Sequence, residues 1–174
     1  MKSLISIVLI GLLGLSLDCQ AQTAPTFPCS EDERYRAFDF WVGEWDVHDS
    51  AGNFAGNNAI SRDEEGCVLV EKWVGGSGVT GQSVNYLDGV SGDWVQVWNS
   101  APGVQIHIRG GLTDEGMLLV GKIHYLSNGN TADFRGLWTL LEDGRVRQFF
   151  EQYDTEAETW NPWFEGFYTR KTAP

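Results

Sequence analysis

Regularly spaced turn signals constrain the fold of this sequence more than any other feature. After residue 42, stretches with period-two alternation are separated by nine short segments, SAGN, EEG, GGSG, LDGVSGD, APG, TDEG, SNGN, EDGR and DTEAE. Such alternation is typical of half-buried β-strands, and segments of this composition are typical of turns. We therefore expect ten antiparallel strands, beginning near residues 43, 54, 67, 79, 93, 104, 116, 131, 145 and 159. Consecutive hairpins close most simply into an all-β, up-and-down barrel, which has no free edges.

One segment before the strands has helical character. Ser30 and Glu33, within SEDERYRAF, have the spacing of a capping box. We expect a short helix over residues 31–41 that closes one end of the barrel. The stretch FDFWVGEWDV would place Phe38 and Trp41 over that end and Trp45 in its floor.

The first residues have the pattern of a secretory signal peptide. Lys2 precedes an apolar run over residues 4–17, which is too short for a comfortable membrane span, and DCQAQTA follows. We expect cleavage after Ala21. A lipoprotein signal ending at Cys19 is the alternative, although Asp18 is unfavourable before such a cysteine. Residues 22–174 would then form one β-barrel domain, secreted or periplasmic, without membrane insertion after signal removal.

Charge and cysteine content narrow the choice of partners. Without residues 1–21 the chain keeps 11 basic and 23 acidic residues, so its net charge remains −12. Such a chain repels phosphate backbones, and we expect no nucleic-acid partner. Cys29 and Cys67 should form one disulfide in an oxidising compartment.

Three hairpins allow the strand register to be predicted. Two-residue turns at 114–115, 128–129 and 143–144 fix which residues face each other, and hence which side chains point inward. The expected inward residues of the later strands are Ile106, Ile108, Leu119, Gly121, Ile123, Phe134, Gly136, Trp138, Leu140, Arg147, Phe149, Glu151, Tyr153, Trp160, Phe164, Tyr168 and Arg170. Those of the earlier strands are Leu69, Glu71, Trp73, Thr80, Gln82, Val84, Trp94, Gln96 and Trp98.

The row of Gly121, Gly136 and Glu151 is the candidate binding site. Two neighbouring glycines leave room beside an inward carboxylate, and small-molecule sites are mostly apolar with a few directed polar groups. The alternative is a glycine-relieved bend beside a buried ion pair of Glu71 or Glu151 with Arg147 or Arg135. The full set of expected ligand-binding residues is Glu71, Gln82, Gln96, Trp98, Gly121, Gly136, Trp138, Arg147, Phe149, Glu151 and Tyr153.

Candidates for other chemistry are few. His107 and His124 share one face of neighbouring strands, but the polar residues around them mark that face as solvent-facing, so we expect no metal site. No Ser-His-Asp arrangement or phosphate-binding loop stands out. Catalytic residues are therefore unknown, apart from general acid–base chemistry by a buried Glu71 or Glu151.

Two short stretches, VGEWDV and GFYTRK, carry a resemblance to a known superfamily. Gly43, Glu44 and Trp45 resemble the G-x-W opening of lipocalins and fatty-acid-binding proteins, together called calycins. In that superfamily an arginine near the end of the last strand lies across this tryptophan. Arg170 has the matching position, so the resemblance implies that Trp45 and Arg170 are structural residues joined by a cation–π contact.

A wider likeness extends over residues 38–171. It includes GCVLVEKWVGGSGVTGQSVNYLD, WVQVW, DGRVRQFFEQYD and TWNPWFEGFYTRK, and resembles a family of uncharacterised, secreted, lipocalin-like bacterial proteins. The likeness implies the fold and not an activity. Haem-binding nitrobindins are similar ten-stranded barrels whose iron ligand is a histidine near the C-terminus. This chain has no histidine after His124, and we expect no cofactor.

Three functions remain open from the sequence, which leans away from an enzyme without excluding one. The first is an exported barrel that binds a small, partly apolar molecule. The second is a cofactor-independent isomerase, cyclase or hydratase that uses a buried carboxylate, by analogy with other barrels. The third is a structural or interaction barrel filled by its own side chains, which include eight tryptophans. The ligand and the oligomeric state are not specified by the sequence.

Overall fold

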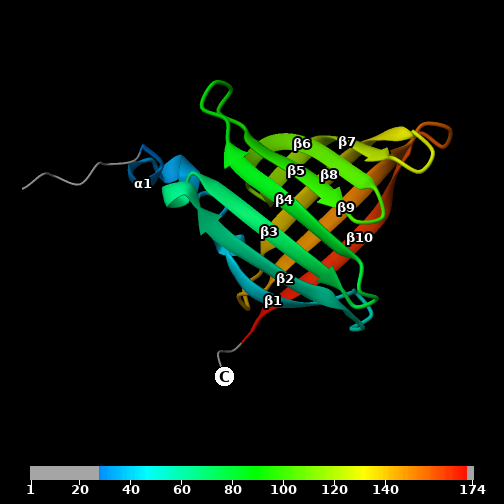
Figure 1. Ribbon diagram of the computed structural model, residues 1–174, viewed down its shortest axis with the longest axis horizontal. Helices are drawn as coiled ribbons and strands as arrows, with labels where there is room; N and C mark the ends of the chain where they lie inside the picture. Colours follow the sequence, from blue (N-terminus) through cyan, green and yellow to red (C-terminus); the bar gives the residue numbers. More distant parts are fainter. Residues whose placement is uncertain (1–27, 172–174) are drawn as a thin grey trace, which may run out of the picture.

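The computed structural model describes residues 28–171, which form a closed antiparallel barrel of ten strands (Figure 1). The strands are β1 (Gly43–His48), β2 (Phe54–Asp63), β3 (Val68–Gly75), β4 (Thr80–Leu87), β5 (Trp94–Ser100), β6 (Val104–Thr113), β7 (Gly116–Tyr125), β8 (Thr131–Leu140), β9 (Val146–Asp154) and β10 (Thr159–Arg170). Consecutive strands pair, and β1 pairs with β10 to close the barrel. The expected fold class is confirmed, and each strand begins within one residue of its expected start. The expected signal peptide and its cleavage site lie outside the described residues.

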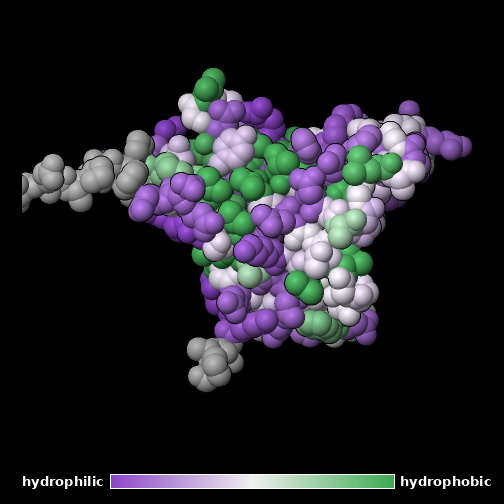
Figure 2. Space-filling model, viewed as in Figure 1, coloured by the Kyte–Doolittle hydropathy of each residue, from purple (hydrophilic) through white to green (hydrophobic). Residues whose placement is uncertain are grey.

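The barrel forms because the strands alternate between an inner apolar side and an outer, more polar side. Hairpin turns join them, and Gly129 and Gly144 supply φ angles of 73° and 81° that favour glycine. The outer side is not uniformly polar. Val70, Val84 and Val97 lie side by side on β3, β4 and β5, and Figure 2 shows hydrophobic surface over these strands. Within residues 28–171, no helix has the length and hydropathy needed to cross a bilayer.

The segment before β1 covers one end of the barrel with short turns and not with one helix. It consists of α1 (Pro28–Glu31), η1 (Glu33–Arg36) and η2 (Asp39–Trp41). The expected helix over residues 31–41 is not formed, and Ser30 lies within α1. Asp32 caps η1 instead, since its Oδ1 accepts a hydrogen bond of 2.9 Å from the Arg34 amide. Tight 3₁₀ turns suit this segment because residues three apart lie on the same side.

An aromatic cluster fills the covered end. Phe38 and Trp41 lie three residues apart, are fully buried, and stack with ring centroids 4.9 Å apart. Phe38 also meets Trp94 edge-on at 5.7 Å and Trp138 at 5.2 Å. The expectation that Phe38, Trp41 and Trp45 close one end is therefore confirmed.

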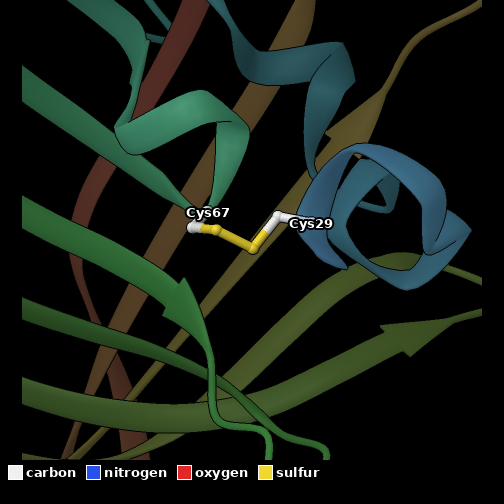
Figure 3. The surroundings of a disulfide bond; sticks show 2 residues. All are labelled: Cys29 and Cys67. Atoms are coloured by element: carbon white, nitrogen blue, oxygen red, sulfur yellow. A yellow bond between two sulfur atoms is a disulfide. The ribbon is translucent and has the colours of Figure 1, made fainter. Parts of the chain in front are cut away.

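A disulfide ties the covering segment to the barrel wall. Cys29 in α1 is bonded to Cys67, which lies between η3 (Glu64–Gly66) and the first residue of β3, and their Cα atoms are 5.1 Å apart (Figure 3). The expected pairing is confirmed. Because the bond closes a loop between residues 38 positions apart, it reduces the freedom of the unfolded chain considerably.

Trp45 and Arg170 close the floor as the calycin resemblance implies. They face each other in the β1–β10 register, and Arg170 Cζ lies 4.3 Å from the centroid of the Trp45 ring. Arg170 Nη1 also donates a hydrogen bond of 3.0 Å to the Val42 carbonyl, and Trp45 Nε1 donates one of 2.9 Å to the Trp41 carbonyl. This contact joins the two ends of the sheet to the covering segment.

The register of the later hairpins is partly as expected. Ile106 lies opposite Ile123 between β6 and β7, as predicted. Between β7 and β8 the loop is longer than two residues, because the Tyr125 amide donates to the Asn130 carbonyl at 2.9 Å. Ile123 therefore faces Ala132 and not Phe134, a shift of two residues that leaves Phe134, Gly136 and Trp138 pointing inward.

Between β8 and β9 the prediction is wrong by one residue. The Leu141 amide donates to the Arg145 carbonyl at 2.8 Å, which leaves a three-residue loop. A loop one residue longer than expected exchanges the inward and outward sides of the following strand relative to the prediction. Leu140 therefore faces Val146, and Val146, Gln148 and Phe150 point inward. The expected inward residues Arg147, Phe149, Glu151 and Tyr153 lie on the outside.

The same error affects β4 and the beginning of β10. Trp73 faces Gly81, so the inward residues of β4 are Gly81, Ser83, Asn85 and Leu87, whereas Thr80, Gln82 and Val84 are exposed. In β10 the pairing shifts between Pro162 and Phe164. This bulge places Trp160 outside, 4.4 Å from the guanidinium of Arg135, whereas Phe164 faces inward.

Candidate ligand cavity

The site expected around Glu151 is not formed. Glu151 lies on the outer face of β9, and its Oε2 accepts a hydrogen bond of 2.6 Å from Arg135 Nε. The space beside Gly136 is not empty either, since a Cβ there would overlap the ring of Phe150. Arg147 pairs on the outside with Glu165 at 2.7 Å.

A different part of the interior contains a cavity. It has a volume of about 130 Å³ and lies in the half of the barrel farther from the Cys29–Cys67 bond. Ten residues line it, namely Glu71, Trp73, Gln96, Trp98, Ile106, Gln148, Phe150, Trp163, Phe164 and Tyr168.

The cavity brings together only part of the expected ligand-binding set. Glu71, Gln96 and Trp98 line it, and their ligand-binding roles stay predictions. Gly121, Gly136 and Trp138 face into the barrel but are not among the lining residues, so no contact with a guest is shown for them. The remaining five, Gln82, Arg147, Phe149, Glu151 and Tyr153, are on the outer face because of the register errors above.

Aromatic side chains form the walls. The rings of Trp73 and Phe164 meet edge-on with centroids 6.0 Å apart, and Phe150 lies 6.4 Å from Phe164. Interior glycines make room for these rings. A Cβ at Gly81 would overlap the indole of Trp98, and one at Gly56 would lie 2.8 Å from that of Trp73. In these strands glycine marks the close approach of a neighbouring ring and not a vacancy.

Glu71 of β3 supplies the only buried carboxylate among the described residues, and its side chain is 3% exposed. Asn58 Nδ2 donates to its Oε1 at 2.7 Å, and Ser83 Oγ donates to its Oε2 at 2.6 Å. No lysine, arginine or histidine within residues 28–171 forms an ion pair with it.

Burial raises the pKa of Glu71 from 4.5 to about 7, although the hydrogen bonds from Ser83 and Asn58 act to lower it. Burial also raises the pKa of Tyr168 well above its ordinary value, and the nearby charge of Glu71 adds to this effect. Glu71 therefore exchanges a proton near neutral pH, whereas Tyr168 remains a neutral phenol.

Glu71 belongs to a belt of hydrogen-bonded polar side chains around the inner wall. On one side, Asn85 Nδ2 donates to Ser83 Oγ at 2.8 Å and Gln96 Nε2 donates to Asn85 Oδ1 at 2.8 Å. On the other side, Asn58 Nδ2 lies 3.3 Å from the hydroxyl of Tyr168, which donates to Gln148 Oε1. The belt crosses β5, β4, β3, β2, β10 and β9.

Four members of this belt were missed by the sequence reasoning, namely Asn58, Ser83, Asn85 and Gln148. On β4 the alternation itself is misleading, because polar Ser83 and Asn85 point inward while Val84 and Tyr86 are outside. Gly81 near the beginning of that strand and Leu87 at its end also point inward. These two residues could have indicated the correct orientation of the strand.

The described residues contain no group of three or more histidine, cysteine, aspartate or glutamate side chains arranged to hold a metal ion. His107 is exposed, and His124 Nδ1 lies 2.7 Å from Thr131 Oγ1 on the outer face.

Fold and site together define a closed β-barrel with an aromatic interior cavity and a buried polar belt. Neither the models of known protein families nor the curated proteins give a match to this chain. The function has to be inferred from the cavity itself, since a barrel fold alone does not specify an activity.

Proposed function

We propose that this protein is an exported, lipocalin-like barrel that binds a small, partly apolar molecule in the cavity. The observation that carries the proposal is a space of about 130 Å³ with aromatic walls and four hydrogen-bonding side chains. We call these four, Glu71, Gln96, Gln148 and Tyr168, the base of the cavity. A dry cavity of about 150 Å³ is known to accept benzene, so the guest should be about one ring in size.

The polar groups at the base support recognition of a guest and not mere filling of the core. Among residues 28–171, neither Gln148 Nε2 nor Gln96 Oε1 has a hydrogen-bond partner, although both side chains line the cavity. Ligand sites commonly combine apolar walls with a few such polar groups, which orient the guest.

Export is supported by the covalent link at the closed end. The Cys29–Cys67 disulfide is consistent with an oxidising compartment, where such bonds persist. The signal-peptide pattern of residues 1–21 and the likeness to secreted lipocalin-like proteins agree with this compartment.

An enzyme is the second candidate, because a specific observation favours it. Glu71 lies in the cavity, and its pKa of about 7 suits a general acid or base near neutral pH. An isomerase, cyclase or hydratase would use its carboxylate to move a proton, with the Tyr168 hydroxyl within the same hydrogen-bonded belt. Turnover of a bound compound that stops in Glu71→Gln, with binding retained, would favour this candidate.

Titration of the protein with single-ring probes tests the proposed function. Benzyl alcohol should change tryptophan fluorescence saturably, since Trp73 and Trp98 line the cavity. Ile106→Phe fills part of the cavity and should weaken binding at least about tenfold, or ~1.4 kcal/mol. Leu112→Phe is the matched control, because Leu112 is 60% exposed on the same strand.

A panel of single-ring alcohols, phenols and amines that leaves the fluorescence and the heat of mixing unchanged would overturn the proposal. That result would favour a barrel whose side chains fill its own interior. Equal binding by Ile106→Phe and wild type would place the probe elsewhere on the molecule. Circular dichroism of each variant shows whether the barrel is folded.

A further inference from the structure

Glu71 differs from the other well-shielded carboxylates of the barrel in having no basic partner. Glu151 pairs with Arg135 at 2.6 Å, and Glu165 pairs with Arg147 at 2.7 Å, both on the outer face. Inside the described barrel, the buried polar residues other than Glu71 are Asn58, Ser83, Asn85, Gln96 and Gln148, all neutral. A buried carboxylate is costly unless a cation or several donors compensate its charge.

The base of the cavity also has an unused acceptor. Gln96 donates through Nε2 to Asn85, which leaves its Oε1 free of partners among residues 28–171. Gln148 Nε2 is a donor without a partner among the same residues, so the acceptors that the cavity offers a guest are the Glu71 carboxylate and Gln96 Oε1.

The walls above this base suit a positive charge. Trp73, Trp98, Phe150 and Phe164 present aromatic rings to the cavity, and the faces of such rings attract organic cations. The whole chain carries a net charge of −12, so its field attracts cationic molecules from solution and repels anionic ones.

We infer that the guest is a small organic ammonium, a primary amine on a single ring or a short apolar chain. Its ammonium group lies against the Glu71 carboxylate and its apolar part lies between Trp73 and Trp98. An ammonium has three N–H donors and no acceptor, which matches the acceptors at the base. This inference rests on the proposed function, because it names the chemistry of the guest for the same cavity.

Binding of an ammonium in this cavity should depend on pH. Ammonium binding needs the ionised carboxylate, and the pKa of Glu71 in the free protein is about 7. The neighbouring strands present only one other titratable group to it, the Tyr168 phenol, since Asn58 and Ser83 are neutral. Affinity for an amine should therefore rise as the pH rises through 7, while the amine itself is still protonated, and each binding event below pH 7 should release a proton.

Calorimetric titration with benzylamine and benzyl alcohol tests the inference, because the two probes have nearly the same shape. At pH 8 the wild type should bind benzylamine about tenfold more tightly than benzyl alcohol, or ~1.4 kcal/mol. Glu71→Gln should abolish this preference and leave benzyl alcohol binding within about twofold. Glu151→Gln is the matched control and should keep the preference, since Glu151 lies on the outer face.

The wild type alone provides a second test, in case Glu71→Gln does not fold. Its affinity for benzylamine should fall at least about tenfold between pH 8 and pH 5.5, whereas its affinity for benzyl alcohol should not change. Equal affinity for both probes, or an amine preference independent of pH and of Glu71, would overturn the ammonium inference and leave the proposed function standing. Failure of both probes to bind would overturn both.

Discussion

The buried Glu71 should make the free energy of unfolding depend on pH. In the folded protein its pKa is about 7, against an ordinary value of 4.5 in the unfolded chain. Between these values the folded state keeps the proton and the unfolded state has released it. The free energy of unfolding therefore falls as the pH rises from 4.5 to 7. At about 1.36 kcal/mol per pH unit, the full loss is about 3 kcal/mol.

The perturbation that isolates this effect is Glu71→Gln, which is nearly isosteric and does not ionise. The pKa values of Asp32, Asp49, Asp88 and Asp143 are lowered by hydrogen bonds, so these groups change stability in the opposite direction. Because both proteins share them, their effect cancels in the comparison. Urea denaturation at pH 4 and pH 8 should show that wild type loses about 3 kcal/mol relative to the variant. Parallel pH profiles of the two proteins would refute a shifted Glu71.

Three further predictions concern the packing and the closure of the barrel. Gly81→Ala should displace the Trp98 indole, which should cost about 1–3 kcal/mol of stability in urea denaturation and abolish probe binding in calorimetry. Gly111→Ala is its control, because a Cβ at Gly111 meets nothing within 4 Å. Removing the disulfide, which joins residues 38 positions apart, should cost about 4 kcal/mol in urea denaturation. Arg170→Met should cost about 1 kcal/mol and shift the emission spectrum of Trp45, because the guanidinium over the ring is lost.

Each of these predictions has an outcome that would contradict it. If Gly81→Ala and Gly111→Ala are equally stable and bind the probe equally well, Gly81 is not needed to make room for the Trp98 ring. An unchanged denaturation midpoint after reduction would show that the disulfide does not restrict the unfolded chain. Unchanged emission and stability in the arginine variant would remove the structural role of the floor contact.

The strands and their order were predictable from the sequence because turn residues interrupt the alternation at every hairpin. The sides of β4 and β9 were not predictable, because one residue more or less in a loop reverses a strand. EDGR looks like a two-residue turn at 143–144, yet the hydrogen bond between Leu141 and Arg145 makes the loop one residue longer. This single residue moved Glu151 to the outside and brought Gln148 inside.

Residues of the candidate site were predictable only on strands whose inward and outward sides were deduced correctly. Glu71, Gln96 and Trp98 were found because the sides of β3 and β5 were correctly deduced. Ser83 and Asn85 were missed because an inward polar belt inverts the usual rule that apolar residues point inward. The room expected beside Gly121 and Gly136 is absent, because sequence spacing could not show that the His107 carbonyl lies close to Gly121 and that the Phe150 ring lies close to Gly136.

Nuclear Overhauser effects between benzylamine and the protein in solution can show whether the guest lies inside the barrel against Glu71. Contacts are expected from the ring protons of the probe to the indole protons of Trp73 and Trp98, which line the cavity, and these contacts should be lost in Ile106→Phe. If saturating benzylamine shows contacts only with side chains of the outer face, the guest does not bind inside the barrel.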